Sequence, residues 1–361
     1  LERAEQDYRK LTSFPDQGAS GYAVLSSFYA RNQRLDEAVT ALEEGLKLDP
    51  NNLSLQRALM KTLIVRGQEQ DRDRALGLLS ALEEKLPRDP ELMKLRALQM
   101  LNEQTPESQQ AAVIKLQDVV KLEPTAVDAH LTLIGIAMRQ SQYEVARDQA
   151  IRGLAANPEN TALLVARGRA ELALERAPMA GQLARIALEQ DPNSLEALDL
   201  LAKAALESDN STLVEETGAR ILATTDRLPT SEPLLLLLAR FSAARQDPKM
   251  AIPALEAYCE SEQGRESIEA VITLADLYRL TGKLDEAYRW IQKAEELAPK
   301  SQTVVHARFL CLLAQERFDD LAQISTSYMA STDQNPGQVI RAAAVLTTME
   351  SKDLKSEGAK L

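Results

Sequence analysis

The sequence predicts an all-α protein built of short repeats, and three observations lead to this class. First, 45% of the 361 residues are hydrophobic and 27% are charged, but only 4% are aromatic. This composition is typical of helices packed on small residues and not of a β-sandwich. Second, Pro124, Pro158 and Pro192 follow one another at intervals of 34 residues, a period that indicates repeated units. Third, prolines end amphipathic stretches and helix-capping residues follow them, as in GLKLDPNN, GLAANPEN and ALEQDPNS.

Aligned on their prolines, these stretches share small or apolar residues at eight positions. In residues 19–52 the positions hold Tyr22, Leu25, Ser26, Tyr29, Ala38, Leu42, Gly45 and Pro50. In residues 268–301 they hold Val271, Leu274, Ala275, Tyr278, Ala287, Ile291, Ala294 and Pro299. The pattern resembles the tetratricopeptide repeat, a helix–turn–helix unit with small residues where its helices cross. The resemblance implies an α-solenoid of stacked antiparallel helix pairs that forms a right-handed superhelix, with the first helix of each pair on the concave surface.

The same register extends along the chain and predicts a single array over residues 1–350. We expect a partial leading repeat over 1–18, which has the phase of a lone second helix, a capping helix over 336–350 and a frayed tail over 351–361. Stacking is required because one repeat cannot bury its apolar face alone. Nine repeats lie between the ends: 19–52, 53–89, 90–126, 127–160, 161–194, 195–231, 232–267, 268–301 and 302–335.

Some repeats depart from this template. The second and third carry one to three extra residues around their internal turns, near 69–72 and 104–107. In the sixth, Val214 stands where a small crossing residue is expected, so we expect the second helix to tilt. In the seventh, Pro253 falls inside the second helix, where it should remove a hydrogen bond and cause a kink. The ninth fits least well, because two large residues occupy positions that prefer small ones, Phe309 and Leu321.

The alignment also makes a direct structural prediction. Four alanines stand where the two helices of a repeat should cross, and we expect all four to be almost fully buried: Ala38, Ala146, Ala180 and Ala287. A larger side chain at such a crossing would overpack it, at a cost of roughly 1–3 kcal/mol.

The sequence offers little that catalysis or metal binding would need. Its two histidines, His130 and His306, lie five repeats apart, and neither has a second ligand at metal-binding spacing. Glycine-rich phosphate loops, HExxH and GxSxG motifs are missing. Cys259 and Cys311 belong to repeats separated by another repeat, so we expect two buried thiols and no disulfide. We therefore expect no catalytic residue, no metal and no cofactor.

Charge and hydropathy exclude two further classes of partner. With 42 basic and 54 acidic residues, the net charge is −12, which disfavours steering toward a nucleic-acid backbone. No apolar run is longer than that from Leu234 to Ala239, which is far shorter than the roughly 18 residues of a membrane span, so we expect no direct membrane insertion. Two isolated cysteines favour a reducing compartment, the cytoplasm over the periplasm.

The candidate binding surface lies on the first helices of the repeats. At the ninth position three consecutive repeats carry a cation, followed by an acid in the eighth repeat: Arg169, Lys203, Arg240 and Asp276. At the fifth position most well-phased repeats carry an apolar residue, among them Leu131, Val165, Leu236 and Ile272. Stacked helices lie about 8–10 Å apart, comparable with the Debye length of about 8 Å, so the three cations can act together on an acidic segment. Alternatively, the cations pair with acids of their own chain, such as Glu171, Asp199 and Glu207.

These features favour a non-catalytic scaffold that binds an extended or helical segment of an acidic protein or peptide in its concave groove. Two alternatives stay open. The array begins part-way through a repeat, which suits the recognition arm of a larger enzyme or of an export or secretion machine whose other domains lie outside these residues. The open ends of the array also suit a self-assembling scaffold, a homo-oligomer in which one copy packs end to end on another.

Overall fold

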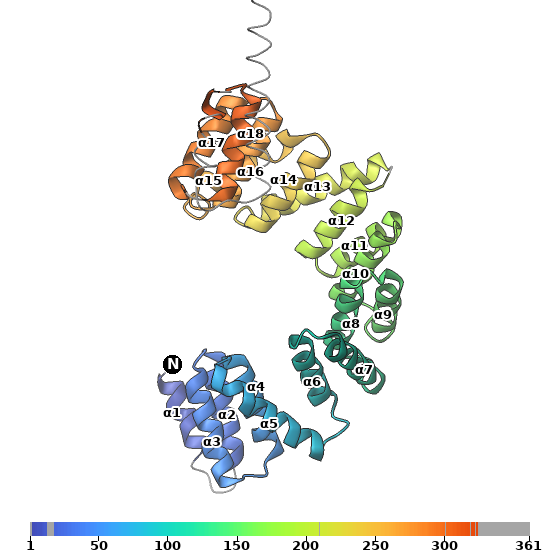
Figure 1. The fold of residues 1–361 in the computed structure, drawn as a ribbon, viewed down its shortest axis with the longest axis vertical. Coiled ribbons are helices and arrows are strands. Elements are labelled where there is room, and N and C mark those ends of the chain that lie inside the picture. Colours follow the sequence, from blue (N-terminus) through green and yellow to red (C-terminus); the bar gives the residue numbers. More distant parts are fainter. Residues whose placement is uncertain are drawn as a thin grey trace, which may run out of the picture. The chain divides into compact units, whose positions relative to one another are not determined.

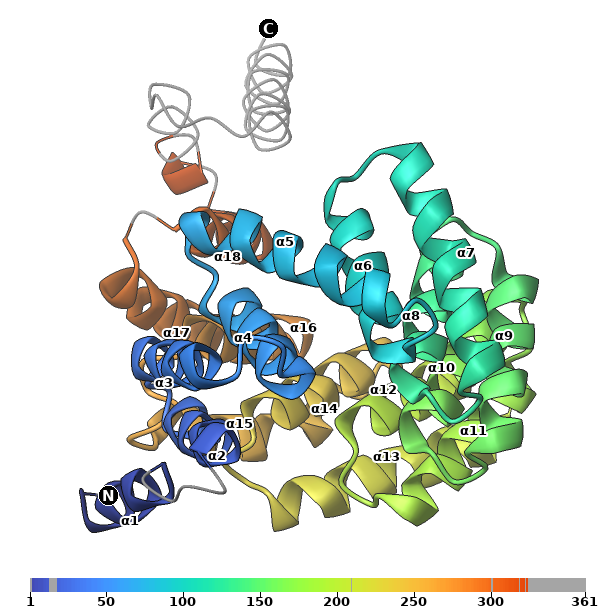
Figure 2. The same ribbon diagram turned by 90° about the horizontal axis from the view of Figure 1, so that it is seen from below.

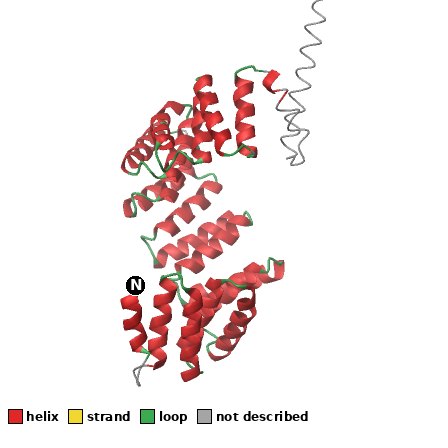
Figure 3. Cartoon of the chain, turned by 90° about the vertical axis from the view of Figure 1, so that its left-hand side faces the viewer, coloured by secondary structure: helices red, strands yellow, loops and turns green. Residues whose placement is uncertain are grey.

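A computed structural model describes residues 2–12, 18–208, 210–299, 301–317, 319–321 and 323. The chain divides into two compact units, Leu1–Pro158 and Glu159–Leu361. Throughout the described residues the regular structure is helical and no strand occurs, so the all-α prediction is confirmed (Figure 3). None of the helices in these ranges is both long enough and apolar enough to cross a lipid bilayer. The prediction of a single array over 1–350 stays a prediction.

The first unit contains a leading helix and four antiparallel helix pairs (Figure 1). The leading helix, α1, packs on α2, and each pair then forms one of the first four predicted repeats. In chain order the helices are α1 (Glu2–Leu11), α2 (Gly18–Arg31), α3 (Leu35–Leu48), α4 (Leu53–Arg66), α5 (Glu69–Lys85), α6 (Pro90–Asn102), α7 (Pro106–Leu122), α8 (Val127–Arg139) and α9 (Tyr143–Ala156).

The second unit continues the same arrangement. Its first helices α10, α12, α14, α16 and α18 follow one another, each in contact with the next (Figures 1 and 2). In chain order the elements are α10 (Thr161–Ala173), α11 (Ala177–Gln190), α12 (Leu195–Leu206), α13 (Ser211–Arg227), α14 (Glu232–Ala244), the 3-10 turn η1 (Pro248–Met250), α15 (Ile252–Glu260), α16 (Ile268–Leu280), α17 (Leu284–Leu297) and α18 (Gln302–Ala314).

Most of the turns between repeats are capped as the sequence predicts. Five of the first helices, α4, α6, α10, α12 and α16, begin after a polar residue whose side chain accepts a hydrogen bond from a backbone N–H in the first turn. Helices α8, α14 and α18 begin without such a cap. The Oδ1 of Asn52 accepts from the N–H of Leu55 at 3.1 Å, and that of Asn160 accepts from Leu163 at 3.0 Å. The Oγ of Ser194 does the same for Ala197 at 3.3 Å.

The turns within repeats share a backbone feature that was not predicted from the sequence. In each of the eight repeats whose fifteenth residue is described, that residue adopts a positive φ, which reverses the chain between the two helices. Only two of the eight are glycines, Gly67 at +68° and Gly282 at +75°. The others hold φ between +56° and +61°: Gln33, Gln104, Ser141, Glu175, Gln246 and Glu316. A polar L-residue in this region costs about 1–2 kcal/mol, so packing of the helix pair must compensate for it.

The register of the helix crossings is confirmed. Ala38, Ala146, Ala180 and Ala287 are each 0% exposed. Gly45, at another signature position, lies so close to the Cβ of Tyr22 that a side chain there would approach it to 2.9 Å. Small residues at these positions therefore allow the paired helices to approach closely.

The extra residues of the longer repeats lengthen the second helix instead of forming a loop. Helices α5, α7 and α13 have 17 residues, whereas α3, α9, α11 and α17 have 14. The buried small residue consequently lies three positions later than in the other repeats, at Ala75, Ala112 and Thr217. The prediction that Val214 occupies the crossing of the sixth repeat is wrong for this reason: Val214 is half-buried, and Thr217 is 1% exposed.

The prediction of a proline kink in the seventh repeat is also wrong. The chain after α14 forms the 3-10 turn η1, and α15 begins only at Ile252. Pro253 therefore lies in the first turn of α15, where no intrahelical hydrogen bond is lost and the fixed φ of proline suits the helix.

The ninth repeat is described mainly through its first helix. Phe309 on α18 is half-buried, and Leu321 is fully buried despite standing at a position expected to prefer a small residue. The predicted capping helix over 336–350 and the predicted tail over 351–361 lie outside the described residues.

Candidate functional site

The three predicted cations, here called the basic row, lie on consecutive first helices of the second unit. Arg169 is on α10, Lys203 on α12 and Arg240 on α14, and all three side chains are exposed to solvent. Because α10 contacts α12 and α12 contacts α14, the three residues lie on adjacent helices. The structure thus brings the row onto one side of one unit.

Part of the basic row is paired with an acid of its own chain. Asp199 lies one turn before Lys203 on α12. Its carboxylate forms an ion pair with Lys203 Nζ at 2.7 Å, and it also lies 3.7 Å from Arg240 Nη2. The two cationic side chains remain 58% and 69% exposed, so these pairs are weak. Arg169 forms no salt bridge with any described residue. The row therefore carries three positive charges against one negative charge.

Neither of the other two expected acids, Glu171 and Glu207, forms a salt bridge with the basic row among the described residues. Glu171 is 3% exposed and lies near two other arginines, Arg167 at 3.7 Å and Arg176 at 3.3 Å. Its burial on α10 makes it part of the packing of the fifth repeat.

The predicted apolar contacts differ in their accessibility. Leu236 on α14 and Ile272 on α16 are half-buried, which leaves part of each side chain for a ligand. Val165 on α10 is only 4% exposed, which corrects the expectation that it offers a contact: it packs inside the repeat. Leu131 is half-buried on α8 in the first unit, and its part in a groove stays a prediction.

A pocket of about 440 Å³ lies between the first helices α14, α16 and α18, and we call it the α14–α18 pocket. Arg240, Ile272 and Asp276 of the predicted surface all line it. The Oδ1 of Asp276 accepts two hydrogen bonds from Arg279, at 2.6 and 2.8 Å, which neutralise its charge on this wall. Three polar residues of the same helices that were not predicted to face a ligand also line the pocket: Thr273, Thr303 and His306.

His130 and the two cysteines, which were considered for chemistry in the sequence, are buried in the packing of the repeats. His130 is 2% exposed, its Nε2 lies 3.0 Å from the carbonyl of Pro124 and its Nδ1 lies 2.7 Å from Nε2 of Gln149. Cys259 and Cys311 are both buried free thiols, and burial raises the pKa of Cys259 to about 12, so its reactive thiolate is disfavoured. Within the described ranges no three His, Cys, Asp or Glu residues come together as metal ligands do.

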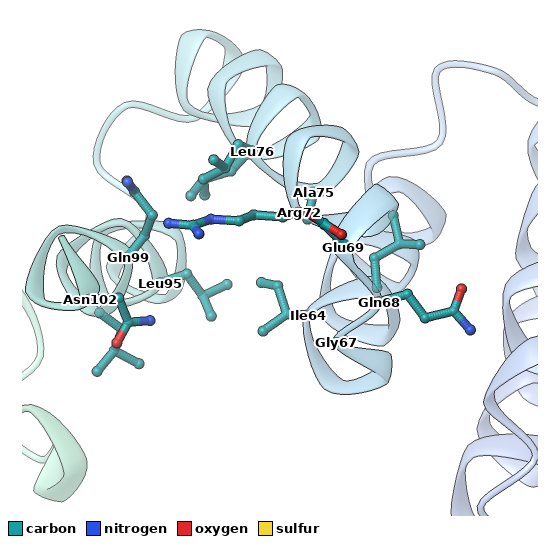
Figure 4. Close-up of a pocket in the computed structure, with 13 residues that line it drawn as sticks. Ile64, Gly67, Gln68, Glu69, Arg72, Ala75, Leu76, Leu95, Gln99 and Asn102 are labelled. Atoms are coloured by element: carbon teal, nitrogen blue, oxygen red, sulfur yellow. The ribbon is translucent and has the colours of Figure 1, made fainter.

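A second pocket lies in the first unit, between α4, α5 and α6, and we call it the α4–α6 pocket (Figure 4). It has a volume of about 530 Å³. Its lining combines aliphatic residues, five of them leucines, with Arg72, Glu69 and three uncharged polar residues, Gln68, Gln99 and Asn102. The extra residues near 69–72 form part of its rim, but the sequence did not predict a pocket.

Comparison with known proteins relates this architecture to tetratricopeptide repeats. Family models described as tetratricopeptide repeat match residues 131–194, 19–52 and 268–301. Among solved structures, yeast Tom70 covers 97% of this chain with 93% of its own length, at 14% identity and a TM-score of 0.52. The human IFIT1 dimer with PPP-AAAA covers 97% with 87% of its own chain, at 15% identity and a TM-score of 0.51. These two likenesses concern the fold alone.

No curated protein matches the chain in sequence. The family-model matches fall near both ends and in the middle of the predicted repeats, and each lies on helix pairs whose buried alanines agree with the same register. The chain therefore contains tetratricopeptide repeats, and this family supports a general role as a scaffold for protein interaction.

Proposed function

We propose that the protein is a non-catalytic scaffold whose second unit holds an extended or helical segment of an acidic protein partner. The segment lies along the first helices, with its carboxylates on the basic row and its apolar side chains on Leu236 and Ile272. The α14–α18 pocket supports this proposal most directly, because Arg240, Ile272 and Asp276, selected from their repeat positions alone, line one hollow.

Electrostatics favours a local mode of recognition. The chain as a whole carries a charge of −12, so acidic segments are repelled except where cations gather. The basic row is such a place, because Asp199 offsets only one of its three charges and does so through exposed, weak pairs. An incoming carboxylate can therefore replace Asp199 on Lys203 or Arg240, or pair with Arg169, at little cost.

The test is peptide binding measured by fluorescence anisotropy. The probes are labelled peptides that combine glutamate and leucine at varied spacings, each with a partner in which glutamine replaces glutamate. Wild-type protein is compared with an Arg169→Glu/Lys203→Glu/Arg240→Glu variant. The control variant carries the same change in charge on exposed residues of the second-helix side of the same unit: Arg185→Glu, Lys249→Glu and Arg289→Glu.

We expect glutamate peptides to bind wild type and the control alike, and to bind the row variant at least about tenfold more weakly, because charge-assisted hydrogen bonds are lost. Circular dichroism must show the same helicity in all three proteins. If the row variant bound the glutamate peptides as tightly as wild type, the basic row would not be the binding site. Equal binding of glutamine peptides would remove the role of charge.

A further inference from the structure

The α4–α6 pocket is lined by one basic residue, Arg72, and one acidic residue, Glu69, and no salt bridge joins the two. Arg72 lies in the first turn of α5, the part by which this helix exceeds the 14-residue second helices, and its side chain is exposed. Figure 4 shows it stretched across the pocket toward Gln99 on α6. It forms no salt bridge with any described residue, whereas most basic residues around it do, Arg66 and Arg74 among them.

Much of the lining beside Arg72 is apolar. Leu63 and Leu79 are 1% and 2% exposed and form its buried part. Ile64 on α4 and Leu98 on α6 also line the pocket and are 48% and 46% exposed. Large exposed aliphatic side chains on two of its helices leave apolar surface that a ligand can cover.

The rim that carries Arg72 is held firmly in place. One residue before it, Asp71 is 3% exposed and accepts two hydrogen bonds from Arg66, at 2.6 and 2.5 Å. This pairing holds the pKa of Asp71 below its usual range. Arg66 also donates to Asp36 on α3 at 2.9 Å, and Gly67 closes α4 with a φ of +68°. The turn between α4 and α5 is thereby tied to two helices, so Arg72 is presented from a fixed base.

We infer that the α4–α6 pocket is a second docking site, which takes a leucine-type side chain of a partner protein together with a neighbouring carboxylate. The aliphatic side chain enters between Ile64 and Leu98, and the carboxylate pairs with Arg72. Charge complementarity selects this occupant, because an unpaired guanidinium over an apolar hollow matches an acidic, aliphatic segment and disfavours a basic one. The site lies in the first unit and does not depend on the basic row of the second.

The occupant is a protein segment, because the pocket is bordered by solvent-exposed aliphatic side chains that a small ligand would leave uncovered and a polypeptide would cover. A fatty acid shares the chemistry of an aliphatic chain and a carboxylate, so the experiment includes one as a separate arm.

The experiment titrates labelled peptides against variants of the full chain. The probes are a helix-forming peptide with leucine and glutamate four residues apart, an extended peptide with the two residues two apart, and copies of each with glutamine for glutamate or serine for leucine. The pocket variants are Arg72→Glu and Leu98→Ser. The matched controls make the same changes at exposed residues away from the pocket, Arg88→Glu in the turn before α6 and Ile114→Ser on α7.

We expect at least one leucine–glutamate peptide to bind wild type and both controls alike, and to bind each pocket variant at least about tenfold more weakly. The glutamine and serine copies should bind wild type as weakly as the original peptide binds the pocket variants. Because the substituted side chains are exposed, all variants should keep wild-type helicity by circular dichroism.

Three results would overturn the inference: equal losses in the controls, no binding of any leucine–glutamate peptide, or displacement of the peptide by decanoate at lower concentrations than by unlabelled peptide. The Arg169→Glu/Lys203→Glu/Arg240→Glu variant separates the two proposals. If a peptide no longer binds that variant but still binds both pocket variants, the result supports the basic row and refutes the α4–α6 pocket. If it still binds that variant but no longer binds the pocket variants, the result supports the α4–α6 pocket and refutes the basic row.

Discussion

Thr217 on α13 offers the sharpest test of the helix register. Its side chain is 1% exposed, and its Oγ1 is buried without a hydrogen-bond partner among the described residues. Burying an unpaired hydroxyl costs about 1–3 kcal/mol, whereas a methyl group of the same shape carries no such penalty. Thr217→Val should therefore stabilise the protein by about 1–2 kcal/mol, an unusual direction for a substitution in a core.

The same helix contains its own control. Thr225 is also 1% exposed, but its Oγ1 donates to the carbonyl of Ile221 at 3.0 Å. Thr225→Val removes a hydrogen bond that is satisfied, so it should be neutral or destabilise the protein by about 1 kcal/mol. Val214→Thr, at the half-buried position first expected at the crossing, should change stability by less than about 0.5 kcal/mol.

The measurement is unfolding by urea and by heat, followed by circular dichroism. The midpoint for Thr217→Val should rise, with an increase in unfolding temperature of about 2–4 °C per kcal/mol for a unit of this size. If Thr217→Val lowered the midpoint, or if Thr225→Val raised it equally, the shifted register of the sixth repeat would be refuted.

Three further predictions use the same assay. Ala287→Leu, at a crossing with 0% exposure, should destabilise the protein by roughly 1–3 kcal/mol through overpacking, and an unchanged midpoint would contradict the tight crossing. Glu175→Gly should stabilise by about 0.5–1 kcal/mol, because Glu175 holds a φ of +61°, and a loss of stability would show that this turn is unstrained. Hydrogen bonds, the largest from Arg34, lower the pKa of Glu5 from 4.5 to about 2, so its stabilisation is full above pH 4.5 and is lost as the pH falls toward 2. Glu5→Gln should flatten the fall of the urea midpoint over this range, and an unchanged slope would remove Glu5 as its source.

Much of the fold could be predicted from the sequence, because each helix pair needs the same kinds of residue at the same positions and the pairs recur about every 34 residues. A small residue at a crossing is required in each pair, so Ala38 and Ala287 identify the same position at opposite ends of the chain and both are fully buried. The longer repeats could not be placed equally well. Three added residues can form a loop or lengthen a helix, and the pattern near 69–72 does not distinguish the two. The structure distinguishes them, because α5 and α13 are 17-residue helices and the shifted residues Ala75 and Thr217 are buried.

The two proposed binding surfaces differ in the same way in how far the sequence predicts them. The basic row could be predicted, because one position of a regular repeat faces the same way on each first helix, and even its acid partner follows from the spacing of Asp199 and Lys203 on one helix. The α4–α6 pocket could not be predicted, because it lies where an added helical turn breaks the regularity. Asp71 lies in that added turn and pairs with Arg66 at the end of α4, while Arg72 forms no salt bridge among the described residues. The second, third and sixth repeats share the longer second helix, and in the second repeat this helix carries an arginine into a pocket. A position outside the common repeat pattern therefore contributes a feature that the pattern itself does not predict.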